Sequence, residues 1–258
     1  MSLPTRHSIS AMQKYEECPK AYEFRYLIKP EVTEDDADHL KIGRAVHAGF
    51  EEAYKVFKAR GLSGSLIAVE CEAIDKLRSE WIDAGLEDHQ AQLEAAEAAV
   101  RRTLLTRSSH HENIIGIEVE FDLPTPAGYN FIGYADLVEK VGPDAVEILD
   151  WKITYKPKDT DEVFRSFQLN NYAWAVREMW PWAKTVWAGE NYPMVDQAVR
   201  VQLVDEHIEF AAARLDADIE AVLAETEWPT RTGYQCKWCS YRNLCPAMAD
   251  LPDDQLDW

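Results

Sequence analysis

Asp136, Asp150 and Lys152 have the types and the spacing that suit metal-assisted hydrolysis. They lie in two strand-like runs that flank a turn signal around Pro143. A hairpin centred on Pro143 would place Asp136 directly opposite Asp150, with Cβ atoms about 5 Å apart. Lys152 would then share the face of Asp150, because side chains alternate along a strand.

Two carboxylates on one face of a sheet repel each other, and a divalent cation relieves the repulsion by binding oxygens of both. An adjacent ammonium group can orient a water molecule or stabilise charge that develops on a phosphate. Asp136, Asp150 and Lys152 therefore predict a metal-dependent site that hydrolyses phosphodiesters. The same residues also fit a solvated pair of carboxylates beside a surface lysine, because short acidic patterns are common.

Further polar residues stand on predicted helices. His47 lies among apolar positions, where a histidine is either a metal ligand or a hydrogen-bonded core residue. Gln168 and Tyr172 are four residues apart and share a helix face, so they either position DNA or the lysine, or pack within an aromatic helix. Three cations downstream of the lysine fit either phosphate contacts or solvated surface charge: Lys156, Lys158 and Arg165.

Five cysteines are present, and three of them form a C-x2-C-x5-C cluster near the C-terminus: Cys236, Cys239 and Cys245. An odd count and the lack of a secretory signal argue against a disulfide framework. The spacing suits a metal centre or cluster, whose fourth ligand would be Cys18 or Cys71. A zinc site with four cysteine ligands and reduced core cysteines are the alternatives.

The order of these motifs resembles the PD-(D/E)XK nucleases of the RecB and AddB type, a group that includes the iron–sulfur nucleases of CRISPR adaptation. The resemblance extends over most of the chain, from SISAMQKYEECPKAYEFRYL to CKWCSYRNLC. Four segments carry it: GRAVHAGFEEAY with His47, GYAD with Asp136, ILDWK with Asp150 and Lys152, and QLNNY with Gln168 and Tyr172.

The resemblance implies a role for each matching residue. His47, Asp136 and Asp150 would be ligands of Mg²⁺ or Mn²⁺, and Glu120 in IEVEF resembles a further acidic position. Lys152 would be the catalytic lysine, with Gln168 and Tyr172 beside it. Four cysteines would hold a [4Fe–4S] cluster: Cys18, Cys236, Cys239 and Cys245. Cys71, on an amphipathic helix, is then expected to be a packed thiol.

The implied activity is metal-dependent exonuclease cleavage of single-stranded or end-containing DNA, in recombination, repair or CRISPR adaptation. No P-loop pattern G-x-x-x-x-G-K-[ST] occurs, so a helicase would be a separate partner. Two other classes of function stay open. One is a non-catalytic module with a nuclease-like fold that binds DNA ends or serves in assembly. The other is a regulatory protein whose cysteines bind a structural zinc ion.

The order of the predicted helices and strands that position these residues indicates a single α+β domain. Its small mixed sheet is expected to be flanked by helices, as in a restriction-endonuclease-like core. Residues 1–110 are mainly helical, 113–204 form the sheet-containing catalytic core, and 205–250 supply a helix and the cluster segment. Individual helices are expected over 8–27, around 46–57, and over 65–107, 166–180 and 205–225. Residues 30–39 read as a solvated loop, and the acidic tail DLPDDQLDW as disordered.

The bulk composition limits the class of protein. The 258 residues include 47% hydrophobic and 28% charged residues, so a packed core is feasible. The net charge of -19 disfavours nonspecific coating of nucleic acid, but a focused site with its own metal is compatible with it. No apolar run is long enough for a membrane span, and the first ten residues lack a secretory signal. A cytoplasmic location without membrane contact is therefore expected.

Overall fold

The computed structural model describes residues 3–31, 38–61 and 65–248, which form two compact units. Unit 1 contains the segments Met1–Asp35, Phe121–Gly133 and Phe210–Trp258. Unit 2 contains the segments Asp36–Glu120 and Tyr134–Glu209. Three elements run from one unit into the other: β2 (Ile114–Pro124), β3 (Asn130–Lys140) and α8 (Asp205–Ala224).

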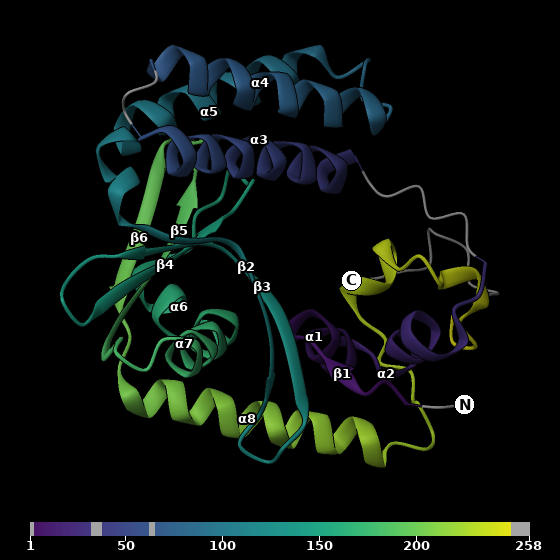
Figure 1. Ribbon diagram of the computed structural model, residues 1–258. Coiled ribbons are helices and arrows are strands. Elements are labelled where there is room, and N and C mark those ends of the chain that lie inside the picture. The colour runs from purple at the N-terminus through teal and green to yellow at the C-terminus, as the bar shows by residue number, and fades with distance from the viewer. Residues whose placement is uncertain (1–2, 32–37, 62–64, 249–258) are drawn as a thin grey trace. The chain divides into compact units, whose positions relative to one another are not determined.

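Three helices form one layer of unit 2 (Figure 1): α3 (Asp38–Arg60), α4 (Leu66–Asp83) and α5 (Gln90–Arg107). The apolar positions predicted around residues 46–57 are buried on α3 and pack against α4. The expected helix over residues 65–107 is two helices. The indole Nε1 of Trp81 donates to the carbonyl oxygen of Leu86 at 2.6 Å, which closes the turn between them.

The sheet of unit 2 is mixed, as predicted. β4 (Ala145–Trp151) pairs antiparallel with β3 and parallel with β5 (Thr185–Tyr192), and β6 (Gln197–Gln202) pairs antiparallel with β5. The helices α6 (Thr160–Phe164) and α7 (Phe167–Met179) lie on the other side of this sheet from α3 (Figure 1). Helices therefore flank both faces.

The hairpin between β3 and β4 has the register that the turn at Pro143 predicts. Leu137 pairs with Leu149 and Glu139 with Glu147, and the amide of Val141 donates to the carbonyl of Ala145 at 2.9 Å. The predicted opposition of the two aspartates follows from this register, because a strand pair fixes which residues face each other.

Unit 1 contains the N-terminal elements β1 (Arg6–His7), α1 (Ile9–Glu17) and α2 (Pro19–Tyr22), followed by a π-helical segment, Glu23–Ile28. The helix expected over residues 8–27 is interrupted at Cys18, because Pro19 cannot continue it and begins a new one. Ser8 caps α1, and its hydroxyl accepts from the amide of Ala11 at 3.2 Å.

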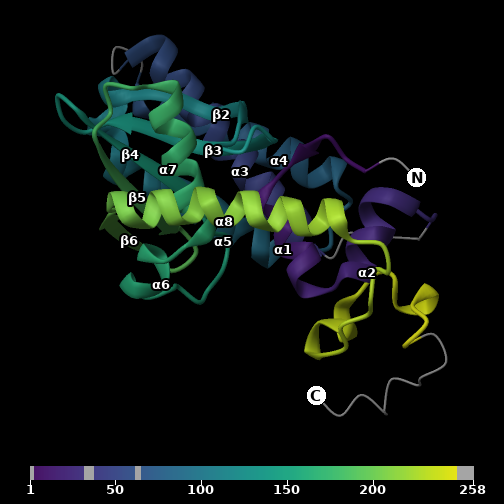
Figure 2. The ribbon, with the colours of Figure 1, turned by 90° about the horizontal axis from the view of Figure 1, so that it is seen from below.

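The C-terminal part of α8 lies beside α1 in unit 1 (Figure 2), where Arg214 pairs with Glu16 at 3.0 Å. Asp216 of α8 is 9% exposed and accepts hydrogen bonds from Thr125 and Ala127 in the turn between β2 and β3. Two predictions fall on residues outside the described ranges: most of the loop at 30–39, and the acidic tail.

Candidate metal centre and catalytic site

Three side chains from different elements of unit 2 converge on one point. His47 of α3, Glu118 of β2 and Asp136 of β3 each offer a ligand atom, and these atoms lie within 4.8 Å of one another. All three residues are half-buried. An imidazole nitrogen and two carboxylate oxygens form a donor set that divalent cations accept.

The backbone of Trp151 orients two members of this group. His47 Nε2 lies 2.9 Å from the carbonyl oxygen of Trp151, so in the neutral ring this nitrogen carries the proton. The amide of Trp151 donates to Asp136 Oδ2 at 2.7 Å. His47 Nδ1 is then left with its lone pair, 3.5 Å from the same Asp136 oxygen. Two acceptors that face each other at this distance need a cation or a proton between them.

Trp151 itself is held by aromatic packing. Its ring stacks on Phe50 of α3 at a centroid distance of 4.2 Å, and Tyr54 lies 5.8 Å away. In the sequence Asp150-Trp151-Lys152 the indole therefore enters the core while its two neighbours point to the other face of the strand. This alternation positions the site.

Burial and mutual repulsion perturb the acids of the group. Burial raises the pKa of Asp136 to about 7, and the nearby Asp150 carboxylate adds to the effect. Burial also raises the pKa of Glu118 to about 7, with a further contribution from Asp136. Burial lowers the pKa of His47, which favours the neutral, metal-binding imidazole. A bound cation would relieve the cost of ionising both acids.

Glu118 enters the group through a local distortion of β2. Its φ is 44°, which is a left-handed conformation that a glutamate rarely adopts. A Cβ on Gly116 would lie 2.2 Å from Val119 Cγ2, so any larger residue would require Val119 to shift beside this kink. Left-handed conformations of residues other than glycine are strained, and such strain clusters at functional sites.

The resemblance predicts Glu120 as a further acidic ligand, whereas the structure brings Glu118 to the group. The structure places Glu120 on an exposed part of β2, where its carboxylate accepts from Tyr134 Oη at 3.1 Å. The three-residue group contains Glu118 and does not contain Glu120. The two glutamates in IEVEF have the same type and the same strand parity, so no signal in the sequence separated them.

Asp150, Lys152 and Gln168 form a polar network beside the metal group. Lys152 Nζ lies 2.7 Å from Asp150 Oδ2, and Gln168 Nε2 donates to Asp150 Oδ1 at 3.0 Å. Gln168 Oε1 also accepts from Lys152 Nζ at 3.4 Å. Burial alone would lower the pKa of Lys152, but Asp150 outweighs it and the pKa is raised, so the side chain stays a cation.

Helix α7 brings Gln168 and Tyr172 to this network on one face, as their spacing predicts. Ser166 caps the helix and accepts from the amide of Leu169 at 3.3 Å. Tyr172 is 9% exposed, and burial raises its pKa to about 12. The phenol therefore stays protonated and can only act by hydrogen bonding and packing.

The loop after β4 is anchored where Lys158 meets Glu190 and Tyr192, two residues that no sequence motif marks. Glu190 of β5 pairs with Asp150 in the sheet register and is 1% exposed. It accepts from Lys158 Nζ at 2.7 Å and from Tyr192 Oη, and Tyr192 Oη accepts from the Lys158 amide at 3.0 Å. Both Lys156 and Lys158 of this loop are exposed, and Lys158 is in addition paired with Glu190.

A groove of about 640 Å³ opens beside the metal group. Its walls are the N-terminal part of α3 and the segment that follows β4, and it reaches His47, Glu118 and Lys152. A molecule that lies in this groove would be next to His47, Glu118 and Lys152.

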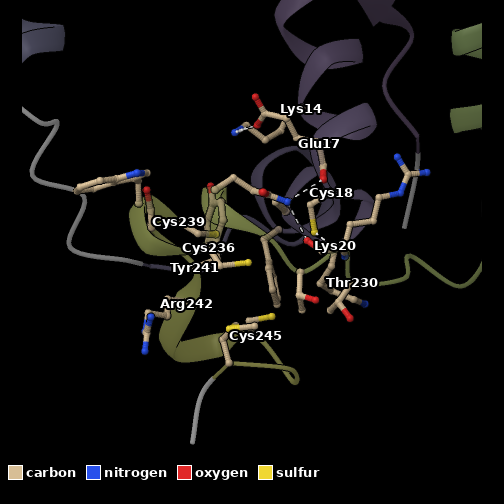
Figure 3. Close-up of a pocket in the computed structure, with 18 of the residues that line it drawn as sticks. Lys14, Glu17, Cys18, Lys20, Thr230, Cys236, Cys239, Tyr241, Arg242 and Cys245 are labelled. Carbon is tan, nitrogen blue, oxygen red and sulfur yellow. Dashed lines mark hydrogen bonds and ion pairs between the residues drawn. The ribbon is translucent and has the colours of Figure 1, made fainter. Parts of the chain in front are cut away.

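All four cysteines predicted to share a centre line one cavity of about 280 Å³ in unit 1. Cys18 follows α1, Cys236 belongs to a short 3-10 turn, Tyr234–Trp238, and Cys239 and Cys245 follow it (Figure 3). Burial raises the pKa of the Cys239 thiol. Five cations also line the cavity: Lys14, Lys20, Arg25, Arg231 and Arg242.

Cys71 is exposed, so the expectation of a packed thiol is wrong. Helix α4 buries the face that carries Val69, Ala73 and Leu77, and Cys71 lies two positions from two of these residues. At 100° per residue this spacing points Cys71 away from the core. It is not among the residues that line the cysteine cavity.

The model of the PD-(D/E)XK nuclease superfamily matches residues 6–246, nearly the whole chain. The chain belongs to the PD-(D/E)XK nuclease superfamily. Nucleases of this superfamily usually use divalent metals, and the group of His47, Glu118 and Asp136 is a candidate site for one. None of the described helices is long and apolar enough to cross a membrane.

Solved structures with a similar fold differ strongly in sequence from this nuclease-superfamily member. A protein of Eubacterium rectale that carries a provisional exonuclease name matches with a TM-score of 0.55 and 13% identity, over 94% of this chain and 86% of that one. The protein SSO0001 matches with a TM-score of 0.44 and 11% identity, over 96% and 89%. No curated protein matches the sequence.

Proposed function

We propose that the chain is a metal-dependent deoxyribonuclease of the RecB and AddB type. The observation that carries the proposal is the convergence of the His47, Glu118 and Asp136 ligand atoms beside the ion pair of Asp150 and Lys152. Such a set of acceptors binds a divalent cation, and membership of the superfamily makes phosphodiester hydrolysis the reaction.

The residues divide into three tasks. His47, Glu118 and Asp136 would hold Mg²⁺ or Mn²⁺, with Asp150 next to them. A bound divalent cation supplies Lewis-acid stabilisation and a more acidic water. Lys152 offsets negative charge that develops on the phosphate, and Gln168 fixes both Lys152 and Asp150 through its amide.

The proposed substrate is DNA that is single-stranded or has free ends, and the proposed mode is exonucleolytic. The resemblance of the motifs to RecB and AddB nucleases supports this choice, and the provisional name of the Eubacterium rectale protein agrees with it. Recombination, repair and CRISPR adaptation are the processes in which such an enzyme would act, with a separate helicase or recombination partner.

A cleavage assay on end-labelled single- and double-stranded DNA tests this function, with RNA of the same sequence for comparison. We expect cleavage with Mg²⁺ or Mn²⁺, none with EDTA, and a product ladder whose label position gives the polarity. The protein should be purified without oxygen. If this protein cleaves nothing with either metal, the proposal is overturned and a module that binds DNA ends takes its place.

We also propose that Cys18, Cys236, Cys239 and Cys245 hold a [4Fe–4S] cluster. Their placement around one cavity supports it, and the cations that line the cavity would offset the charge of a thiolate-ligated centre. The alternative occupant of this cavity is a zinc ion with four thiolate ligands, at Zn–S distances of about 2.3 Å.

Cys18→Ser is expected to remove iron and visible absorbance and to lower the melting temperature, because the cluster would join residue 18 to residues 236–245. Cys71→Ser is the matched control, since this exposed cysteine does not line the cavity and its loss should leave iron content unchanged. Elemental analysis of anaerobically purified protein provides the measurement. Zinc in place of iron, or an unchanged melting temperature after cluster loss, would contradict the assignment.

A further inference from the structure

We infer that the groove beside the metal group binds a single DNA strand, with Gly43 at the point of closest backbone approach and Arg44 on a neighbouring phosphate. The inference rests on the proposed nuclease function and adds the path of the substrate. Groove and metal group both lie in unit 2. The residues that line the groove beside Gly43 and Arg44 include His39, His47, Glu51, Glu118 and Lys152.

Gly43 has no structural explanation within the described chain. It is the sixth residue of α3, where glycine is among the least favourable residues for a helix. A Cβ at this position would have no described atom within 4 Å, apart from its chain neighbours and the backbone of its own helix. Alanine here would therefore favour the helix without a clash with any described atom.

Gly49, on the same helix, is a glycine that close packing requires. Its Cβ would lie 3.1 Å from the carbonyl oxygen of Ala73 and 3.2 Å from Leu77 Cβ, so close packing against α4 requires glycine. Gly43 meets no such neighbour, and the space beside it belongs to the groove. A ligand backbone that approaches the helix closely accounts for glycine at this position.

The position of Gly43 relative to the metal group indicates which part of a substrate passes it. Gly43 precedes His47 by four residues, so the two share a face of α3 and are separated by about 6 Å along the axis. A strand whose reacting phosphate lies at the metal group would continue past Gly43. A sugar–phosphate backbone fits this description, because it is narrow, extended and charged.

The charges in the groove are divided in a way that suits a polyanion. Glu51 and Glu118 lie toward the metal end, where a divalent cation would neutralise acids. Arg44 and His39 lie toward the other end, and Arg44 is exposed. Arginine is well suited to phosphate because its guanidinium group can donate two hydrogen bonds to it.

Gly43→Ala is expected to change stability and binding in opposite directions. The melting temperature should rise by about 2–4 °C, because alanine favours the helix. Affinity for a fluorescein-labelled single-stranded 15-mer, measured by anisotropy in EDTA, should fall by at least about tenfold, because a methyl group enters a close contact. Gly43→Leu should bind more weakly still. Higher stability with unchanged affinity would overturn the inference.

Arg44→Met tests the phosphate contact through salt dependence. The slope of log affinity against log salt should fall by about one, because one counterion-releasing contact is lost. Arg60→Met is the matched control, since Arg60 ends the same helix, pairs with Glu72 at 2.5 Å and does not line the groove. If the salt-dependence slopes of the two variants are equal, Arg44 does not contact a phosphate of the bound strand.

Binding in EDTA separates this inference from the proposed function. Wild-type protein that binds the 15-mer but cleaves nothing would overturn the nuclease proposal and leave the groove assignment standing. If wild-type protein cleaves DNA but Gly43→Leu binds the 15-mer as tightly as wild type, the nuclease proposal stands and the groove assignment is overturned. If duplex of the same sequence binds more tightly than the single strand, and Gly43→Leu weakens neither, the single-strand assignment is wrong.

Discussion

Lys152→Ala is expected to lower kcat for metal-dependent DNA cleavage by about 10²–10³-fold, the usual cost of removing one preorganised charge-stabilising donor. Lys152 Nζ lies 2.7 Å from Asp150 and is also held by Gln168, so the ammonium group is fixed before substrate arrives. The metal-binding group of His47 and its partners contains no atom of this lysine, and KM should therefore change little. Single-turnover rates at saturating Mn²⁺ provide the measurement.

Lys156→Ala is the matched control for this prediction. Lys156 is exposed on the same loop, and the structure gives its ammonium group no contact with Asp150 or Gln168. The control should cleave at the wild-type rate. If Lys152→Ala protein also cleaves at that rate, the lysine serves only as a counter-ion for the buried Asp150, and charge stabilisation must come from the metal alone.

The hairpin that carries Asp136 and Asp150 could be predicted because its information is local. A turn at Pro143 sets which residues of β3 and β4 face each other, and the side-chain period of two then places Lys152 with Asp150. The spacing of Gln168 and Tyr172 similarly fixes a shared helix face. Whether any of these residues performs the assigned role stays a prediction.

Residues that join the site through distant pairing or distortion were not predictable. Glu190 lies next to Asp150 because β5 pairs in parallel with β4, and the two residues are far apart in the sequence. Glu118 reaches the metal group only because β2 is kinked there, with a φ of 44°. Alternation along a regular strand treats Glu118 and Glu120 as equivalent, so pattern alone could not choose between them.

The acidic character of the chain also gains a local explanation. A net charge of -19 opposes long-range attraction of DNA, which requires binding to depend on short-range features. If the chain binds DNA as proposed, those features in unit 2 would be the metal group and the groove with Arg44, both of which act at contact distance. We therefore expect affinity for DNA to depend on divalent metal more than it does for a basic nucleic-acid-binding protein.

Divalent metal is expected to raise the melting temperature strongly at pH 8 and little at pH 5.5. Asp136 and Glu118 have pKa values near 7 in the metal-free fold, above the usual value of a carboxyl group. Both acids bind their protons more tightly in the fold than in the unfolded chain, so protonation stabilises the fold at low pH. This stabilisation is lost as the pH rises from the usual carboxyl range to about 7. Bound metal offsets this loss above pH 7, whereas below it protons compete with the metal.

At 100 times the dissociation constant, Mn²⁺ should raise the melting temperature by about 5–10 °C at pH 8, from a binding contribution of about 2.7 kcal/mol. Asp136→Asn should melt higher than wild type in EDTA at pH 8, because a buried charge is gone, and should lose the response to metal. Glu118→Gln should also lose most of the response. Glu120→Gln, altered on the exposed face of the same strand, should keep it. A metal response that Glu120→Gln abolishes and Glu118→Gln retains would show that Glu120, and not Glu118, binds the cation.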